Sequence, residues 1–417
     1  MGPGFFPLDE ELGLLPGHLT PRLQEGLVRL STHIPSFAKA ACELAFFTQT
    51  EVHRSTARRL TEAAGAAAVA VADAAVAQIA QTYPPSPPGP DTLIFSVDGA
   101  MIPLVGGQWA EVRTLAVGSV APPVERDGER VIVTQDLSYF SRLTDSSTFG
   151  QLALGELHRR GIERAGRVGA VVDGAEWCQT VIDLHYPEAV RILDFSHAAG
   201  YLLAIGQTEG PEGPLLTEAE RARLLERFKH TDPSAVLQDL RDLVADHPQL
   251  PELTKLLAYL DKREAQMQYP TFQAAGWPIG SGSVESANKL VVEERLKGPG
   301  MHWADGNVNP LLALRNAFCN DRWKEVWGQI EVELRRQWQA RRAGRQQRRV
   351  SAPPLPEMGA MPEQVPAVRM PSAVQAKPSA PPLEEHQVDA PAARPAATHP
   401  WRKAWSVRRQ RELAAAA

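Results

Sequence analysis

The chain has 417 residues, 43% hydrophobic and 22% charged, which is an ordinary composition for a soluble globular protein with room for two or three domains. The formal net charge of −5 does not indicate a uniformly basic nucleic-acid-binding protein, although seven arginines gather between residues 335 and 349. The three cysteines, Cys42, Cys178 and Cys319, are far apart and lack CxxC spacing, so neither a disulfide framework nor a cysteine zinc site follows from them.

Two segments of the N-terminal region indicate where the protein is located: its first residues and an alanine-rich run. The first residues include Asp9, Glu10 and Glu11 and lack the basic start of a signal peptide. The alanine-rich run over residues 63–81 is interrupted by Asp73, and alanine contributes little to membrane insertion, so we expect a soluble helix. The sequence therefore predicts a cytoplasmic protein with no membrane span.

Residues 1–82 are predicted to form an N-terminal helical domain. Its first 17 residues are apolar and acidic and are expected to form an extended strap, and residues 20–31 have helical periodicity. Residues 35–65 predict two short helices around a tight turn, the second carrying Arg54, Arg58 and Arg59 near its start. This pattern favours a DNA-binding helix-turn-helix, with an ordinary helical hairpin as the alternative.

A proline-rich linker, YPPSPPGP at residues 83–90, precedes a region that alternates strands and helices. Residues 91–206 predict three consecutive strands and then alternating helices and strands, an order that indicates a mixed sheet covered by helices. This is the element order of ribonuclease-H-like α/β folds. The expected strands cover residues 92–97, 109–120, 131–140, 167–172 and 190–195, and the expected helices cover 148–166, 175–186 and a segment from about 196.

The rest of the chain predicts a helical insertion, a return to the sheet domain and a tail. Residues 207–270 are helical by period, and residues 271–334 form the last part of the core, with a Gly/Ser-rich turn running into a helix and a further helix over 310–327. Residues 335–417 are first basic and then rich in proline and alanine, which predicts a disordered tail. A last basic patch, WRKAWSVRRQR, is a second candidate for contact with nucleic acid or simply part of a solvated tail.

Three carboxylates stand where a ribonuclease-H-like sheet would bring them together. Asp98 and Asp173 follow the expected first and fourth strands, and Glu285 lies in the first turn of the helix after the Gly/Ser-rich turn. Converging carboxylates repel one another, and two Mg²⁺ or Mn²⁺ ions would relieve that repulsion while binding phosphate oxygens. Asp194 competes with Asp173 for the second position, and together with His197 it is alternatively a support or a phosphate contact.

The segment after Glu285 is basic, broken by glycine and tipped by an aromatic residue. Its side chains are expected to follow a DNA backbone, and the tryptophan is a candidate for stacking on a splayed base, although such tryptophans are more often core or rim residues. The candidates are Lys289, Arg295, Lys297, His302 and Trp303.

Four segments together resemble a DDE transposase of a bacterial insertion sequence, of the ISKra group with a Mutator-like layout. They read PLDEELGL (7–14), VDGAMIP (97–103), VVDGAEWCQTVIDLHYPEAVRILDFSH (171–197) and GSGSVESANKLVVEERLKGPGMHW (280–303). The resemblance implies that Asp98, Asp173 and Glu285 are the catalytic and metal-binding triad, and it places Asp194 and His197 in the family's DxxH element. Family members usually carry a longer N-terminal region with paired cysteines, so this N-terminus is expected to be short.

The resemblance implies a DNA transposase that cleaves and rejoins insertion-sequence ends by two-metal phosphodiester hydrolysis and strand transfer. Its expected partners are double-stranded DNA, both transposon ends and target, and further copies of itself assembled on that DNA in the nucleoid. The alternative is a truncated or transposon-derived DNA-binding protein with little catalysis. A glycoside hydrolase with a carboxylate pair is a third reading, which makes no use of the basic segment after Glu285.

Overall fold

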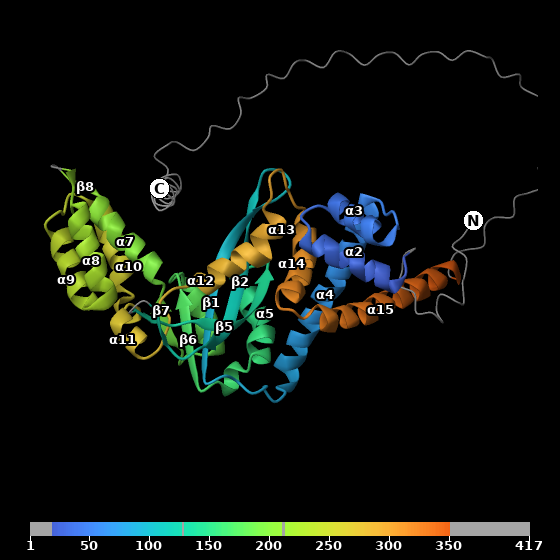
Figure 1. Ribbon diagram of the computed structural model, residues 1–417, viewed down its shortest axis with the longest axis horizontal. Helices are drawn as coiled ribbons and strands as arrows, with labels where there is room; N and C mark the ends of the chain where they lie inside the picture. The colour runs from blue at the N-terminus through green and yellow to red at the C-terminus, as the bar shows by residue number, and fades with distance from the viewer. Residues whose placement is uncertain (1–18, 127–128, 211–212, 351–417) are drawn as a thin grey trace, which may run out of the picture. The chain divides into compact units, whose positions relative to one another are not determined.

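The protein is a mixed α/β structure built on one five-stranded mixed sheet, seen in a computed structural model that describes residues 19–126, 129–210 and 213–350 (Figure 1). The strand order is β5-β2-β1-β6-β7, with antiparallel pairing of β1 with β2 and of β2 with β5, and parallel pairing of β1 with β6 and of β6 with β7. The strands are β1 (Thr92–Pro103), β2 (Trp109–Val120), β5 (Thr134–Arg142), β6 (Arg167–Val172) and β7 (Val190–Leu193). The expected mixed sheet of three consecutive strands followed by two alternating ones is therefore present.

The first strand is longer than the sequence pattern predicted. Asp98-Gly99 looked like a turn that ends the strand, but β1 continues to Pro103 and Asp98 pairs with Thr114 of β2. The hairpin turns later, where Gly106 and Gly107 have φ of 89° and 77°, values that suit glycine. The prediction was wrong because Asp-Gly is a frequent turn dipeptide, whereas here the long antiparallel pairing with β2 keeps the backbone extended.

Helices cover both faces of the sheet. On one face, α5 (Ser146–Arg159) and α6 (Glu176–His185) bury a core around Phe95, Phe149 and Ile182. On the other face, Ala100 and Ile102 of β1 pack against the consecutive helical segments α12 (Gly282–Ala287), η3 (Asn288–Glu293) and α13 (Glu294–Leu296) and against α14 (Asp305–Cys319). The helix that carries Glu285 thus lies on the sheet face to which even-numbered residues of β1 point.

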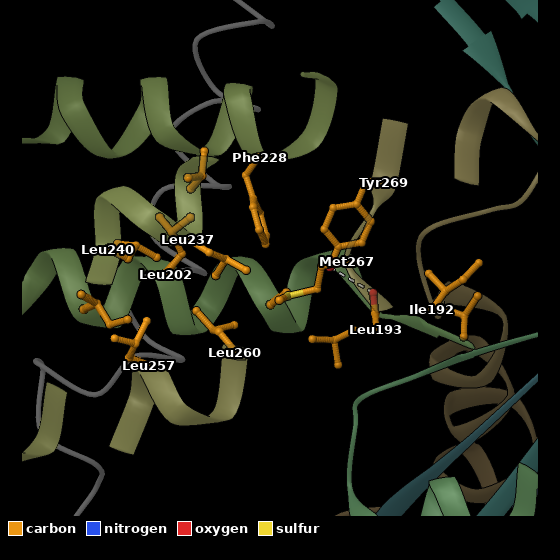
Figure 2. Packing of buried hydrophobic residues seen from close by; sticks show 14 of the residues in the cluster. Ile192, Leu193, Leu202, Phe228, Leu237, Leu240, Leu257, Leu260, Met267 and Tyr269 are labelled. Carbon is orange, nitrogen blue, oxygen red and sulfur yellow. Dashed lines mark hydrogen bonds between the residues drawn. The ribbon is translucent and has the colours of Figure 1, made fainter. Parts of the chain in front are cut away.

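The residues predicted to form a helical insertion are helical, and their core is shared with the sheet. Helix α7 (Phe195–Gln207) leads from β7 into α8 (Glu218–His230), α9 (Pro233–Ala245) and α10 (Pro251–Asp261), and η2 (Glu264–Gln266) and α11 (Tyr269–Ala274) lead back. Figure 2 shows Leu202, Phe228, Leu237 and Leu260 of these helices packed in one cluster that also includes Leu193 at the end of β7. One continuous core therefore connects the insertion to the strand ends.

The N-terminal helices pack against the C-terminal helices. The segments α2 (Pro21–His33), α3 (Phe37–Thr48) and the first half of α4 (Arg54–Thr82) share a core with α14 and α15 (Trp323–Val350). Helix α4 is long and apolar enough to cross a membrane by length and composition. It packs along α14, and its Asp73 forms an ion pair with Arg142 of β5. Residues 19–350 belong to one compact unit.

Two asparagines of α14, Asn309 and Asn316, and its C-cap residue Asn320 close the free edge of β5. Tyr139 donates its N–H to Asn320 Oδ1 (2.8 Å) and accepts from Asn320 Nδ2 (2.8 Å). Asn316 bonds the N–H and carbonyl of Ser141 in the same way (3.0 and 3.2 Å), and Asn309 bonds those of Leu143 (2.8 and 2.9 Å). We call these three residues the asparagine ladder. It satisfies an edge strand that would otherwise offer unpaired groups to another chain.

Several predicted boundaries were wrong for local reasons. Helix α5 begins at Ser146 because Asp145, not Thr148, is its N-cap, and the single helix expected over 310–327 is two helices that break where Asp321 has a φ of 54°. The arginine-rich segment expected to begin the disordered tail continues α15 to Val350, consistent with the high helix propensity of arginine, glutamine and alanine. Short hairpins at Val124–Arg126 with Glu129–Val131 and at Glu209–Gly210 with Gly213–Pro214 were not predicted. The strap at 1–17 and the tail from 351 lie outside the described residues.

Candidate active site

The register of the sheet aligns three aspartates at one edge. Phe95 of β1 pairs with Ala170 of β6, so three residues further along each strand come Asp98 and Asp173. Val172 pairs with Leu193 of β7, so the next residue of each strand is Asp173 or Asp194. Asp98 is therefore placed beside Asp173 although it is not at the end of its strand, because the parallel partner β6 stops and leaves β1 to run on.

The charges of Asp173 and Glu285 act on the carboxyl group of Asp98. Burial raises the pKa of Asp98 above its ordinary value, and the negative charges of Asp173 and Glu285 raise it further. Bonds from the Gly99 N–H (2.7 Å) and from Asn288 Nδ2 (2.9 Å) act in the opposite direction. The excess of negative charge at this point is what a divalent cation would neutralise.

Asp173 lies in a turn that leaves its carboxylate partly exposed. Its Oδ1 atom accepts the N–H of Ala175 (2.9 Å) and the thiol of Cys178 (3.4 Å). Burial, followed by the charge of Asp173, raises the pKa of that thiol, so Cys178 stays a neutral donor. These contacts fix the Oδ1 atom of Asp173 at the end of β6.

Asp194 has a different position and different partners. It is 4% exposed and caps α7, where its Oδ2 atom accepts the N–H of His197 (2.7 Å). Its Oδ1 atom accepts the N–H of Ser281 (2.7 Å), the residue just before α12. Both oxygens accept backbone donors, so Asp194 holds the turn that begins the Glu285 helix, whereas in Asp173 a backbone donor bonds one oxygen.

Asn288 is a site residue that the sequence reasoning missed. It lies one helical turn after Glu285, on the same face, and donates Nδ2 to Asp98 Oδ2. It is 6% exposed, and its Oδ1 atom is buried with no hydrogen-bond partner in the protein. The three-residue spacing of Glu285 and Asn288, which puts both on one face of a helix, was the sequence signal that would have indicated Asn288. A buried oxygen that has no partner and lies beside an acid is available to bind a cation or to accept a hydrogen bond from water.

The helix that carries these residues widens into a π-helical turn over η3. A π-turn leaves carbonyl groups without their usual partners, and here the fully buried Arg315 of α14 supplies donors. Its guanidinium bonds the carbonyls of Leu290 and Val291 and forms an ion pair with Glu294 (2.6 Å). Arg315 therefore fixes the C-terminal half of the helix against the core.

Two of the expected DNA contacts are core residues. Arg295 is 1% exposed, lies between the rings of Phe37 and Trp303 (4.9 and 5.2 Å to the centroids) and donates Nε to the Ser31 carbonyl (2.9 Å). Its burial and the charge of Arg315 lower its pKa to about 10. Trp303 is 9% exposed and donates Nε1 to the Leu296 carbonyl (2.9 Å). Placing both on a DNA-facing surface was wrong. The glycine-broken loop brings Trp303 back onto the β1–β2 hairpin, and Arg295 is enclosed by Trp303 and by Ser31 and Phe37 of the N-terminal helices.

The other expected DNA contacts are at the surface. Lys289, Lys297 and His302 are exposed after Glu285, with Lys297 paired to Glu293 (2.7 Å). Three arginines are exposed in the first turns of α4, after a five-residue loop from α3: Arg54, Arg58 and Arg59. His197 is partly exposed and lies 5.4 Å from the ring of Tyr201.

The side chains as they stand do not form a finished ligand set: across the residues described, no group of three His, Cys, Asp or Glu is close enough to hold a metal ion. No protein-family model matches the chain, and no curated protein matches its sequence significantly.

Proposed function

We propose that the protein is a DDE transposase that cleaves and rejoins insertion-sequence ends, with Asp98, Asp173 and Glu285 as its catalytic carboxylates. The observation that carries the proposal is the sheet register, which places Asp98 beside Asp173, with the helix of Glu285 packed on the face to which Asp98 points. The charges of Asp173 and Glu285, which raise the pKa of Asp98, support it. Support also comes from the strand order β5-β2-β1-β6-β7, which is the order of ribonuclease-H-like folds with the first strand at the centre.

The donor set fits Mg²⁺ or Mn²⁺. Three carboxylates and the unpartnered Oδ1 atom of Asn288 are hard oxygen donors, which these ions prefer, and sulfur is represented only by a neutral thiol turned toward Asp173. When bound, two such ions activate a water or a 3′-hydroxyl for attack on a phosphodiester and stabilise the leaving oxygen. Asp98, Asp173 and Glu285 would hold them.

The protein's own residues then have separate tasks. Asn288 orients the Asp98 carboxylate through its 2.9 Å bond, and Asp194 orients the start of the Glu285 helix through Ser281. The exposed Lys289, Lys297 and His302 would contact the phosphate backbone near the reacting bond, and the arginines at the start of α4 would contact DNA further away.

The test is a nicking and strand-transfer assay on DNA that carries the element's own ends, run with Mg²⁺ and with EDTA. The proposal expects metal-dependent products with 3′-hydroxyl ends that disappear in Asp98→Ala, Asp173→Ala and Glu285→Ala. DNA that is bound and never cut by the wild-type protein would instead favour a transposon-derived DNA-binding protein.

A further inference from the structure

The helical insertion reaches back and bonds the ends of the two strands that carry Asp173 and Asp194. The Tyr259 hydroxyl, from α10, donates to the carbonyl of Asp173 itself. The Tyr269 hydroxyl, at the start of α11, donates to the carbonyl of Leu193 at the end of β7 (3.1 Å), which Figure 2 shows as a dashed line. Both bonds fix backbone next to an acidic residue.

Arg263, which follows α10, bonds the turn that begins with Asp173 and Gly174. It is 6% exposed, and both its Nε (3.1 Å) and Nη2 atoms donate to the Gly174 carbonyl. Its guanidinium stacks on the ring of Tyr259 (3.9 Å) and also reaches Glu176 (3.2 Å). Three donors from the insertion therefore converge on two consecutive carbonyls, those of Asp173 and Gly174.

Gly174 shows how close this approach is. It has a φ of 81°, and a Cβ atom added there would lie 2.5 Å from the Tyr259 hydroxyl and 2.6 Å from Arg263 Nε. Only a glycine both adopts this backbone conformation readily and leaves room for the two side chains. Burial raises the pKa of Tyr259, so its hydroxyl remains a proton donor across the physiological range.

We infer that Tyr259 and Arg263 are positioning residues that set the orientation of the Asp173 carboxylate from the helical insertion. This inference rests on the proposed function of Asp173 as a metal ligand. The Asp173 side chain is attached to the backbone that these donors hold, and one of its oxygens is already fixed by Ala175 and Cys178. Removing the donors frees the backbone to rotate and moves the remaining oxygen away from the ion.

The experiment compares Tyr259→Phe with Tyr201→Phe. The two tyrosine rings stack on one another (3.9 Å between centroids, interplanar angle 4°), so either change removes one hydroxyl from the same pair. Only the Tyr259 hydroxyl bonds the Asp173 carbonyl. The readouts are Mn²⁺ affinity by calorimetry, thermal stability, and amide hydrogen exchange over residues 172–176.

Tyr259→Phe is expected to weaken Mn²⁺ binding by about 10-fold, in line with losses seen when groups behind a metal ligand are removed, while Tyr201→Phe leaves it unchanged. Exchange over 172–176 rises in Tyr259→Phe alone. DNA cleavage by that variant recovers at saturating Mn²⁺, which a general folding defect would not allow. Arg263→Lys keeps the charge, loses the two-donor contact with Gly174 and is expected to behave like Tyr259→Phe.

Equal Mn²⁺ affinities for the two tyrosine variants would overturn the inference and leave the proposed function intact. A wild-type protein that binds no Mn²⁺ would overturn the proposed function, and with it the positioning role. The exchange data would then still show whether Tyr259 and Arg263 hold the Asp173–Gly174 backbone, so the two failures can be told apart.

Discussion

Removing one member of the asparagine ladder should destabilise the protein by more than an ordinary hydrogen-bonding residue does. Asn316→Ala breaks two bonds, of 3.0 and 3.2 Å, and leaves the N–H and carbonyl of Ser141 without their partners. Ser141 is 1% exposed, so water cannot readily replace the lost groups. An unsatisfied buried polar group costs about 1–3 kcal/mol, and two of them predict a loss of about 2–6 kcal/mol.

The measurement is urea unfolding of the full chain, with Asn307→Ala as the control. Asn307 lies on the same helix, and its amide donates to the Glu62 side chain (2.8 Å), not to a strand. Its loss should cost about 1 kcal/mol or less, because Glu62 is partly exposed and can turn to solvent. Equal losses in the two variants would refute the claim that α14 completes the β5 edge. Because an uncovered edge strand invites pairing with another chain, Asn316→Ala should also aggregate sooner during refolding.

Three further outcomes are expected. Because the pKa of Asp98 is raised in the folded state, its contribution to the stability of the metal-free protein falls as the pH rises from the unfolded-state pKa through the folded-state pKa. Asp98→Asn should remove this fall, which thermal unfolding in EDTA from pH 3 to 8 would show. Parallel stability curves for the two proteins would contradict the assignment. Asn288→Ala should weaken Mn²⁺ binding by about 10-fold, and calorimetry that finds no change would remove Asn288 from the site. Gly65→Ala should cost about 1–3 kcal/mol in urea unfolding, because the new Cβ atom would lie 2.3 Å from the Pro310 carbonyl oxygen where α4 crosses α14; an unchanged midpoint would show that the two helices separate easily.

Much of the sheet could be predicted because its strands follow simple patterns. Four of the five strands were expected within a few residues, and the order of three strands followed by alternating units was correct. The error at Asp98 came from a local rule, since an aspartate before a glycine forms a turn unless a partner strand continues past it. That partner, β2, becomes visible only when the pairing is known.

The positions of the candidate acids along the strands could be predicted from the sequence, whereas the burial of the residues around them could not. The three acids were proposed from their places after strands and at a helix start; the register places Asp98 beside Asp173, and the charges of Asp173 and Glu285 raise the pKa of Asp98. The burial of Arg295 and Trp303 was missed because a basic, glycine-rich segment is usually a surface loop. Arg295 is buried by Phe37, which is distant in the sequence, and Trp303 folds back to bond the carbonyl of Leu296. Tyr259 gave no sequence signal, since only the folded insertion brings it to Asp173.

The most direct test of the central claim is a crystal soaked with Mn²⁺ and measured for anomalous scattering. The claim is that Asp98, Asp173 and Glu285 form one cation site, and it predicts anomalous density between these three carboxylates. In Asp173→Ala the density should weaken or disappear, while in Tyr201→Phe it should remain. Density bound by Asp194 instead of Asp173, or a wild-type protein with none at this sheet edge, would contradict the account.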